Sequence, residues 1–309
     1  MSTTEVQKNQ STVDNTVPSR RWLIVGLSTL AGFLLTIVWS AQFVDGVIGK
    51  NVANTLLGYD AENTEITGAA TGILFALVTG LAGTFTACNI AVFGTMAPML
   101  GRAPSWRERA RATLAPLMWL SAGMVAVSAL YGVIVGLVGT SMPQFSTVPN
   151  VPGELSARSI QSMVVFGLIG LAMIYLGLAA LKIVRDPFAN SPRARMIFLG
   201  VLVGGFLIGR PYPLFRHMFR DAAERGDPVY GAAAFVLQSI GNIIVMALLL
   251  VIVAAVFGGR LGRWLTADPR RAVVLTAAGL IVAGVFTFMY WDLRLLSNRD
   301  IIWYPKLWS

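Results

Sequence analysis

The sequence predicts an all-α, polytopic membrane protein with about seven transmembrane helices, and composition is the first reason. Of 309 residues, 55% are hydrophobic and only 13% are charged, and the mean hydropathy is +0.68. A soluble domain typically carries about 25% charged residues. The apolar residues also fall into long runs separated by short basic clusters, which is typical of membrane-spanning helices.

The counts of redox-active and metal-binding side chains exclude some kinds of site. The single cysteine cannot form a disulfide within the chain, and a single histidine without an acidic cluster argues against a metal site built from this chain alone. We therefore expect no metal and no cofactor.

The chain begins with a polar segment, residues 1–21, which is rich in Ser, Thr, Asn and Gln and ends at Arg20 and Arg21. This composition predicts a disordered tail. The apolar run Trp22–Val44 follows, and as a helix it would span about 30 Å. We interpret it as an extra, uncleaved N-terminal transmembrane helix.

Six further apolar runs divide into two groups of three. They predict a first three-helix repeat over residues 68–184 and a second over residues 196–291, followed by an aromatic tail over residues 292–309. The six runs are Gly68–Leu100, Thr113–Gly139, Ile160–Val184, Met196–Ile208, Val229–Phe257 and Ala272–Trp291.

The basic residues predict the orientation. Fifteen of the 24 Lys and Arg residues fall on one side of the alternating runs. The positive-inside rule then places the N-terminus in the cytoplasm and the C-terminus outside the inner or plasma membrane of a prokaryote. The same rule accounts for the net charge of +9 without a nucleic-acid partner, so lipid is the expected surroundings. The acidic loop Asp45–Glu65 and the aromatic tail are then extracytoplasmic.

The first run of each group is rich in glycine and is interrupted by polar or proline residues near its middle. An odd number of spans in each group means that the second copy enters the membrane from the opposite side, which predicts an inverted-topology repeat. In such proteins the paired broken helices line the substrate or redox site, because unwound backbone is tolerated at membrane depth only where it is buried or wetted. The alternative is that the glycines only allow close helix packing.

The first break offers a cysteine among polar residues. Thr84, Thr86, Cys88 and Asn89 interrupt an apolar run that ends near Pro98. Lone membrane cysteines often serve only as small packing residues. The functional interpretation is a provisional catalytic thiol, whose thiolate a cation such as Arg210 from the second repeat would favour.

The second break contains Arg210, Pro211 and Pro213, and neither proline can continue a regular helix. Arg216, His217 and Arg220 come next, and they predict a cationic mouth on the outer side. The alternative is an interfacial amphipathic stretch whose arginines meet lipid headgroups. His217 alone reads as a surface residue rather than a proton relay.

Two amides lie one helical turn apart in the sixth span, at Gln238 and Asn242. Amides within lipid seek partners, so this pair either joins helices or lines a polar path. No carboxylate lies deep within a predicted span, since Asp292 falls at the end of the last one. This argues against a proton-coupled carrier.

The arrangement resembles the transmembrane region of the DsbD/CcdA family, within the wider LysE-like group. The similar stretches are Gly83-Thr-Phe-Thr-Ala-Cys88-Asn-Ile-Ala-Val-Phe-Gly94 through Pro98 in the first repeat, and the Gly- and Pro-broken stretch from Gly204 to Pro213 in the second. Members of that family carry reducing equivalents across the membrane with one cysteine in each repeat. This chain keeps Cys88 but has no second cysteine, so it would be a divergent, single-cysteine member.

Three functions remain open at this point. The resemblance implies a protein that assists thiol-redox or cytochrome c maturation, in which Cys88 exchanges with a thioredoxin-like or an extracytoplasmic thiol or haem protein. The missing cysteine and the cationic segment favour instead a LysE-like exporter of a small solute or ion. A non-catalytic subunit of a membrane complex fits the same features.

Overall fold

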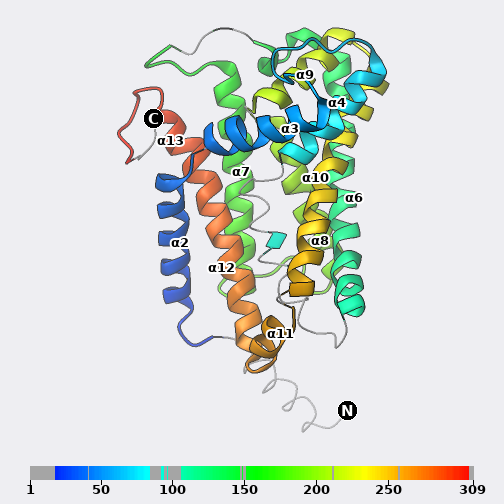
Figure 1. The fold of residues 1–309 in the computed structure, drawn as a ribbon. Helices are drawn as coiled ribbons and strands as arrows, with labels where there is room; N and C mark the ends of the chain where they lie inside the picture. Colours follow the sequence, from blue (N-terminus) through cyan, green and yellow to red (C-terminus); the bar gives the residue numbers. More distant parts are fainter. Residues whose placement is uncertain are drawn as a thin grey trace.

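The computed structural model describes residues 18–40, 42–83, 92–93, 96, 106–146, 148, 151–210, 212–256 and 258–305, and every regular element in these ranges is helical (Figure 1). The longer elements are α2 (Arg21–Val38), α3 (Lys50–Leu57), α4 (Ala69–Ala82), α6 (Trp106–Val138), α7 (Ala157–Ala180), α8 (Pro192–Gly205), α9 (Pro213–Arg225), α10 (Pro228–Val256), α11 (Gly258–Thr266) and α12 (Pro269–Phe288). Short π- and 3-10 segments are η1 (Gln42–Gly49), η4 (Phe206–Ile208) and η5 (Met289–Leu293), and α13 (Arg294–Ser297) extends η5.

Proline marks where several of these helices begin. Pro192, Pro213, Pro228 and Pro269 are the first residues of α8, α9, α10 and α12. The fixed φ of proline suits the first helical turn, where the missing N–H has no intrahelical partner to lose. These four prolines therefore act as helix starts, whereas Pro116 lies inside α6.

Five helices of the described part are long and apolar enough to cross a membrane, and the bent pair of α8 and α9 raises the number to six if it is one span. This agrees with a multi-pass membrane protein. Of the predicted run Gly68–Leu100, the structure describes α4 with its flanking glycines and, beyond Gly83, only residues 92–93 and 96. The count of seven spans therefore stays a prediction.

The helices pack in a reciprocal pattern. The central pair is α6 against α10, with α4 packed on α10 and α8 packed on α6. Beside them α7 packs against α12, and α2 packs on the far side of α12. Exchanging α4 with α8, α6 with α10 and α7 with α12 turns the α4–α10 contact into the α8–α6 contact, and it leaves the α6–α10 and α7–α12 contacts as they are. The contact of α2 with α12 has no equivalent.

Matching glycines allow the two outer contacts to be close. A Cβ on Gly80 of α4 would lie 1.9 Å from a carbonyl oxygen of α10, and one on Gly200 of α8 would lie 1.9 Å from a carbonyl oxygen of α6. Gly241 of α10 and Gly123 of α6 face them in return, at 2.3 and 2.1 Å from the opposing carbonyl oxygens. At these four positions no other residue fits without a backbone shift.

The first span is shorter than predicted because the chain turns at Trp39. There α2 ends, and Arg294 donates to the carbonyl oxygens of Thr36 at 2.6 Å and of Trp39 at 2.8 Å. A basic side chain can satisfy the last carbonyls of a helix in this way. The segment Asp45–Glu65, expected as a loop, instead forms most of η1 and α3, which lie across the ends of the spans (Figure 1).

The last span is longer than predicted. Instead of ending at Trp291, α12 continues through η5 and α13, so that the candidate span runs over Pro269–Ser297. Asp292 therefore lies within the helix rather than at its end, half-buried and facing Gly167 of α7. The candidate span thus carries this carboxylate near its end, where the sequence predicted it just beyond the span.

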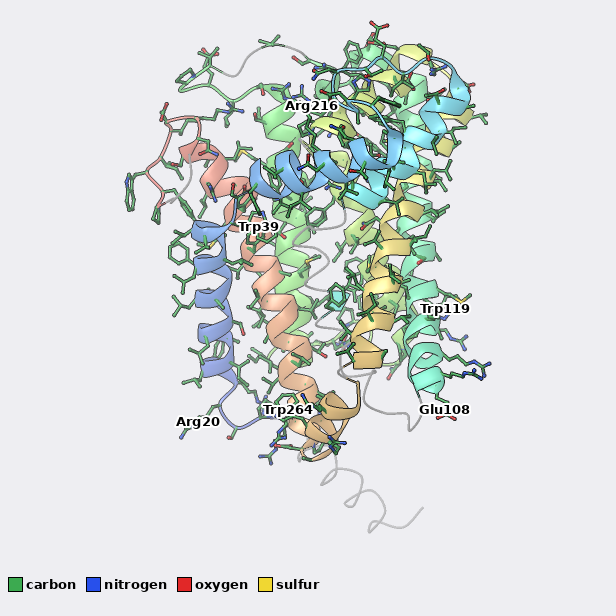
Figure 2. All side chains as sticks on the ribbon, in the orientation of Figure 1. Arg20, Trp39, Glu108, Trp119, Arg216 and Trp264 are labelled. Atoms are coloured by element: carbon green, nitrogen blue, oxygen red, sulfur yellow. The ribbon has the colours of Figure 1, made fainter. Side chains whose placement is uncertain are left out.

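The labelled residues of Figure 2 identify the two ends of the bundle. Figure 2 shows Arg20, Glu108 and Trp264 at one end and Arg216 at the other. The guanidinium of Arg21 also donates to the carbonyl oxygen of Lys182 at 3.2 Å, which joins two of the basic clusters at that first end. We refer below to the opposite end, with α9, α3 and the start of α7, as the α9 end.

Candidate functional site

The described part of the first break meets the second break through Arg210. At its C-terminal end α4 leaves carbonyl groups without intrahelical partners. The Arg210 guanidinium donates to the carbonyl oxygen of Gly83, the residue that ends α4, at 2.8 Å. A Cβ on Gly83 would lie 2.8 Å from the same guanidinium, so a larger residue there would displace the end of the Arg210 side chain.

The second break is a sharp bend whose freed carbonyl groups are bonded by side chains. Between α8 with η4 and α9 the chain turns by 81°. The carbonyl oxygen of Ile208 accepts from Gln161 at 2.7 Å and also from the amide of Gln144, and that of Gly209 accepts from Ser162 at 2.7 Å. Each unwound carbonyl is thus held by a polar residue of α7 or of the segment before it.

Arg210 is buried between a carboxylate and an aromatic ring. Its side chain is 9% exposed and lies 3.9 Å from the carboxylate of Asp45 in η1, and its guanidinium stands 4.8 Å from the centre of the Tyr212 ring. Burial raises the pKa of Asp45 above its ordinary value, and the positive charge of Arg210 opposes this. The positive charge of Arg210, which is costly to bury, is therefore partly balanced by a carboxylate from a different segment.

Tyr212 ties the segment η1–α3 to this junction. Its ring is 1% exposed, and its hydroxyl is buried without a hydrogen-bond partner among the described residues. A Cβ on Gly49, the last residue of η1, would lie 2.6 Å from that hydroxyl. The end of η1 therefore rests directly on the second break.

A small cavity beside the junction gathers positive charge. It measures about 100 Å³ and is lined on its charged side by Arg158, Arg210, Arg216 and Arg299. Ser162 and Gln144 are among its polar lining residues, and no Asp or Glu is among those described. We call this space the arginine cavity. Its volume corresponds to about three water molecules.

The arginines of this cavity come from separate segments and converge. Arg158 at the start of α7 and Arg216 of α9 both donate to the carbonyl oxygen of Ser146, at 2.7 and 3.4 Å. Arg299, beyond α13, lies 3.5 Å from the hydroxyl of Ser159. Burial and the charge of Arg158 lower the pKa of Arg299 below its ordinary value.

The residues of the predicted cationic mouth lie on α9 in different surroundings. Arg216 lines the cavity, and Arg220 is half-buried with an Nε atom that has no partner among the described residues. His217 is half-buried, and its ring packs on that of Phe75 with 5.4 Å between the ring centres. Asp221, one helical turn later, is bonded to Tyr230 and, at 2.9 Å, to Arg225.

The amide pair of α10 lies in the bundle rather than at the arginine cavity. Gln238 and Asn242 are 2% and 8% exposed, and the backbone of Gln238 is where α4 packs through Gly80. The Oδ1 atom of Asn242 has no partner among the described residues. The hydrogen bond that joins α10 to α6 is formed instead by Ser239 and Ser128, at 2.5 Å.

Several predicted residues lie outside the described residues. These are Thr84, Thr86, Cys88, Asn89, Pro98 and Pro211. Pro213, by contrast, is described and begins α9.

Sequence reasoning missed part of the site. Asp45, Arg158 and Arg299 had been assigned only to loops and tails. For the two arginines a signal was present, because they belong to the minority of basic residues that fall on the side of the membrane that the positive-inside rule disfavours.

Comparisons with known proteins leave the site as the main guide to function. No protein-family model, curated protein or solved structure matches the chain.

Proposed function

We propose that this protein is a membrane carrier for a small solute, with the solute path at the junction of the two broken helices. The observation that carries the proposal is the contact between the breaks: Arg210 of the second reaches the carbonyl oxygen of Gly83 at the first, at 2.8 Å. Carriers built from inverted repeats bind their solutes where paired discontinuous helices meet near the midplane.

The helix contacts support the inverted repeat that this proposal requires. The pairs α4–α10 and α8–α6 are equivalent under an exchange of the two groups of three helices, and each is made close by a pair of facing glycines. The extra helix α2 packs outside this arrangement, on α12. A carrier of this kind moves one group against the other around the fixed site.

The membrane and its sides are part of the same proposal. The two basic clusters joined by Arg21 and Lys182 lie at one end of the bundle, and the positive-inside rule assigns that end to the cytoplasm of a prokaryotic cell. The α9 end and the arginine cavity then face outward, and η1 contacts the adjoining junction through Asp45 and Gly49.

Site accessibility tests the carrier without knowledge of the substrate. Because the chain has a single cysteine, the Cys88→Ser variant gives a thiol-free background. In that background Ser162→Cys places one thiol in the arginine cavity, while Glu62→Cys and Arg185→Cys place exposed reference thiols at the two ends. The probe is an impermeant maleimide, applied to sealed vesicles of either orientation.

A carrier exposes the Ser162→Cys thiol to the reagent from both sides, whereas each reference thiol reacts from one side only. If the thiol at position 162 reacts from one side alone, in every condition of lipid and salt, the path does not alternate and the carrier proposal is wrong.

A second candidate is the thiol-redox role of the DsbD/CcdA type, because Arg210 lies against Gly83, five residues before Cys88 in the chain. A cation that contacts the chain so few residues from Cys88 would favour the thiolate form of this cysteine. Non-reducing gels test this role: mixed-disulfide adducts with a thioredoxin-like or extracytoplasmic thiol protein that vanish in the Cys88→Ser variant support it. Unchanged function of that variant rejects it.

A further inference from the structure

We infer that the arginine cavity binds a small, doubly charged oxyanion of the size of sulfate or hydrogen phosphate, and that this anion is the transported substrate. The inference rests on the proposed carrier function and names its substrate class. The first observation is the charge of the cavity. Four arginines line its volume of about 100 Å³, and no described lining residue is an Asp or a Glu.

Such a concentration of like charge in a partly buried space is unfavourable unless something balances it. Two unit charges about 4 Å apart interact by about 4 kcal/mol at an effective dielectric constant of 20. Asp45 offsets Arg210 from outside the cavity, but no Asp or Glu is among the described lining residues beside Arg216 and Arg299. A bound dianion would supply the missing negative charge.

The hydrogen-bond donors of the cavity fit an oxyanion. The Nε atoms of Arg216 and Arg299 are buried and have no partner among the described residues. Arg158 and Arg216 converge on one neutral oxygen, the carbonyl of Ser146. Planar guanidinium groups bind the oxygens of sulfate, phosphate and carboxylate in a bidentate manner.

The size and walls of the cavity favour a compact anion over a lipid. A volume of about 100 Å³ has no room for an acyl chain beside the headgroup. The lining groups of Ser162, Gln144 and the Gly209 backbone are polar. A lipid phosphate could enter only by its headgroup, and the experiment separates that source from a free anion.

The test measures anion binding to the purified full-length protein. Sodium sulfate and sodium phosphate are titrated by calorimetry against a background of sodium chloride at constant ionic strength. We expect saturable binding of at least one oxyanion, and the Arg216→Gln and Arg299→Gln variants should each raise its Kd by at least about tenfold.

The matched control is Arg225→Gln, which removes an arginine of the same helix α9 that is paired with Asp221 instead. Its Kd should stay within about twofold of the wild-type value. Arg216→Lys keeps the charge but loses the bidentate geometry, and an intermediate Kd is expected, which guards against an Arg216→Gln variant that merely misfolds.

Three results would overturn the inference. They are a lack of oxyanion binding by folded protein, equal weakening by Arg225→Gln and Arg216→Gln, and loss of free-anion binding in nanodiscs of anionic lipid but not of zwitterionic lipid. The last result would assign the site to lipid phosphate. Because binding is measured without transport, two-sided access without anion binding would refute this inference and leave the carrier. Anion binding with one-sided access would refute the carrier and the transport of the anion, and leave the binding site.

Discussion

Replacing Arg210 by methionine tests whether one buried cation holds the two helix breaks together. Methionine keeps much of the length and volume of the side chain but removes its charge and its donors. The variant loses the 2.8 Å hydrogen bond to Gly83 and leaves Asp45 without the guanidinium 3.9 Å away. Both remaining groups lie in a poorly hydrated junction.

The structure sets the size of the loss. An unsatisfied buried acceptor costs about 1–3 kcal/mol. Removing one partner of a buried ion pair costs about 3–5 kcal/mol, but Asp45 is 21% exposed, and it can also accept a proton because burial already raises its pKa. We therefore expect about 1 kcal/mol for the carbonyl group and about 3 kcal/mol for the ion pair, a total loss of about 4 kcal/mol in the free energy of unfolding.

A double-mutant cycle with Asp45→Asn isolates the pair. The asparagine is neutral, so in its presence Arg210→Met no longer strands a charge. We expect a coupling of about 1–3 kcal/mol between the two substitutions. The assay is equilibrium unfolding in mixed detergent micelles, followed by tryptophan fluorescence. A loss below about 1 kcal/mol for Arg210→Met, or strict additivity in the double variant, would refute this role of Arg210 at the junction.

Three further predictions concern charge and packing. Because burial raises the pKa of Asp45, the folded protein holds this proton to higher pH than the unfolded chain, and the resulting stability is present below the unfolded-state pKa and lost as pH rises through the folded-state pKa. In that acidic window the free energy of unfolding of the wild type should therefore fall with rising pH, and its slope should be less negative in Asp45→Asn. Gly80→Ala and Gly200→Ala should each lower the free energy of unfolding by about 1–3 kcal/mol or more, because the added methyl group meets backbone. The control Gly26→Ala, whose Cβ meets no atom within 4 Å, should be neutral or slightly stabilising. Thermal unfolding of the three variants checks this, and an equal effect at all three sites would contradict it. Ser239→Ala should cost about 0.6 kcal/mol and at most about 1.7 kcal/mol in the same assay, and a larger loss would mean that more than its 2.5 Å hydrogen bond joins α6 to α10.

The breaks could be located from the sequence because their residues act locally. Arg210, Pro211 and Pro213 stand close together and do not favour a continuous helix, so the interruption after Gly205 is predictable without tertiary contacts. Arg210 was equally visible, since a charge in an apolar run demands a partner. The partner itself was not visible: Asp45 is far away in sequence, and packing alone brings it to Arg210.

The arginine cavity was the least predictable feature for the same reason. Arg158, Arg216 and Arg299 stand on three different segments, and only the arrangement of α7, α9 and α13 makes them neighbours. The helical segment across the junction was also misread. Polar residues such as Asp45, Lys50 and Asn51 predict a loop by composition, although Ala53 and Gly49 pack inward against the bundle.

Asp292 changes the view of coupling that the sequence suggested. It lies in a helix that continues beyond Trp291, and one of its carboxylate oxygens is buried without a partner among the described residues. Asp45 in η1 and Asp292 in η5 thus both lie in helical segments beside the long helices. A lack of carboxylates within the helices therefore no longer argues against proton coupling.

Uptake by proteoliposomes tests the central claim most directly. Purified protein is reconstituted in one lipid mixture, and the entry of radiolabelled sulfate and phosphate is followed for the wild type, Arg216→Gln and Arg225→Gln. We expect saturable uptake of at least one of these anions by the wild type and by Arg225→Gln, and its loss in Arg216→Gln. Uptake no greater than in protein-free liposomes, from protein that is folded and binds the anion, would contradict the carrier function.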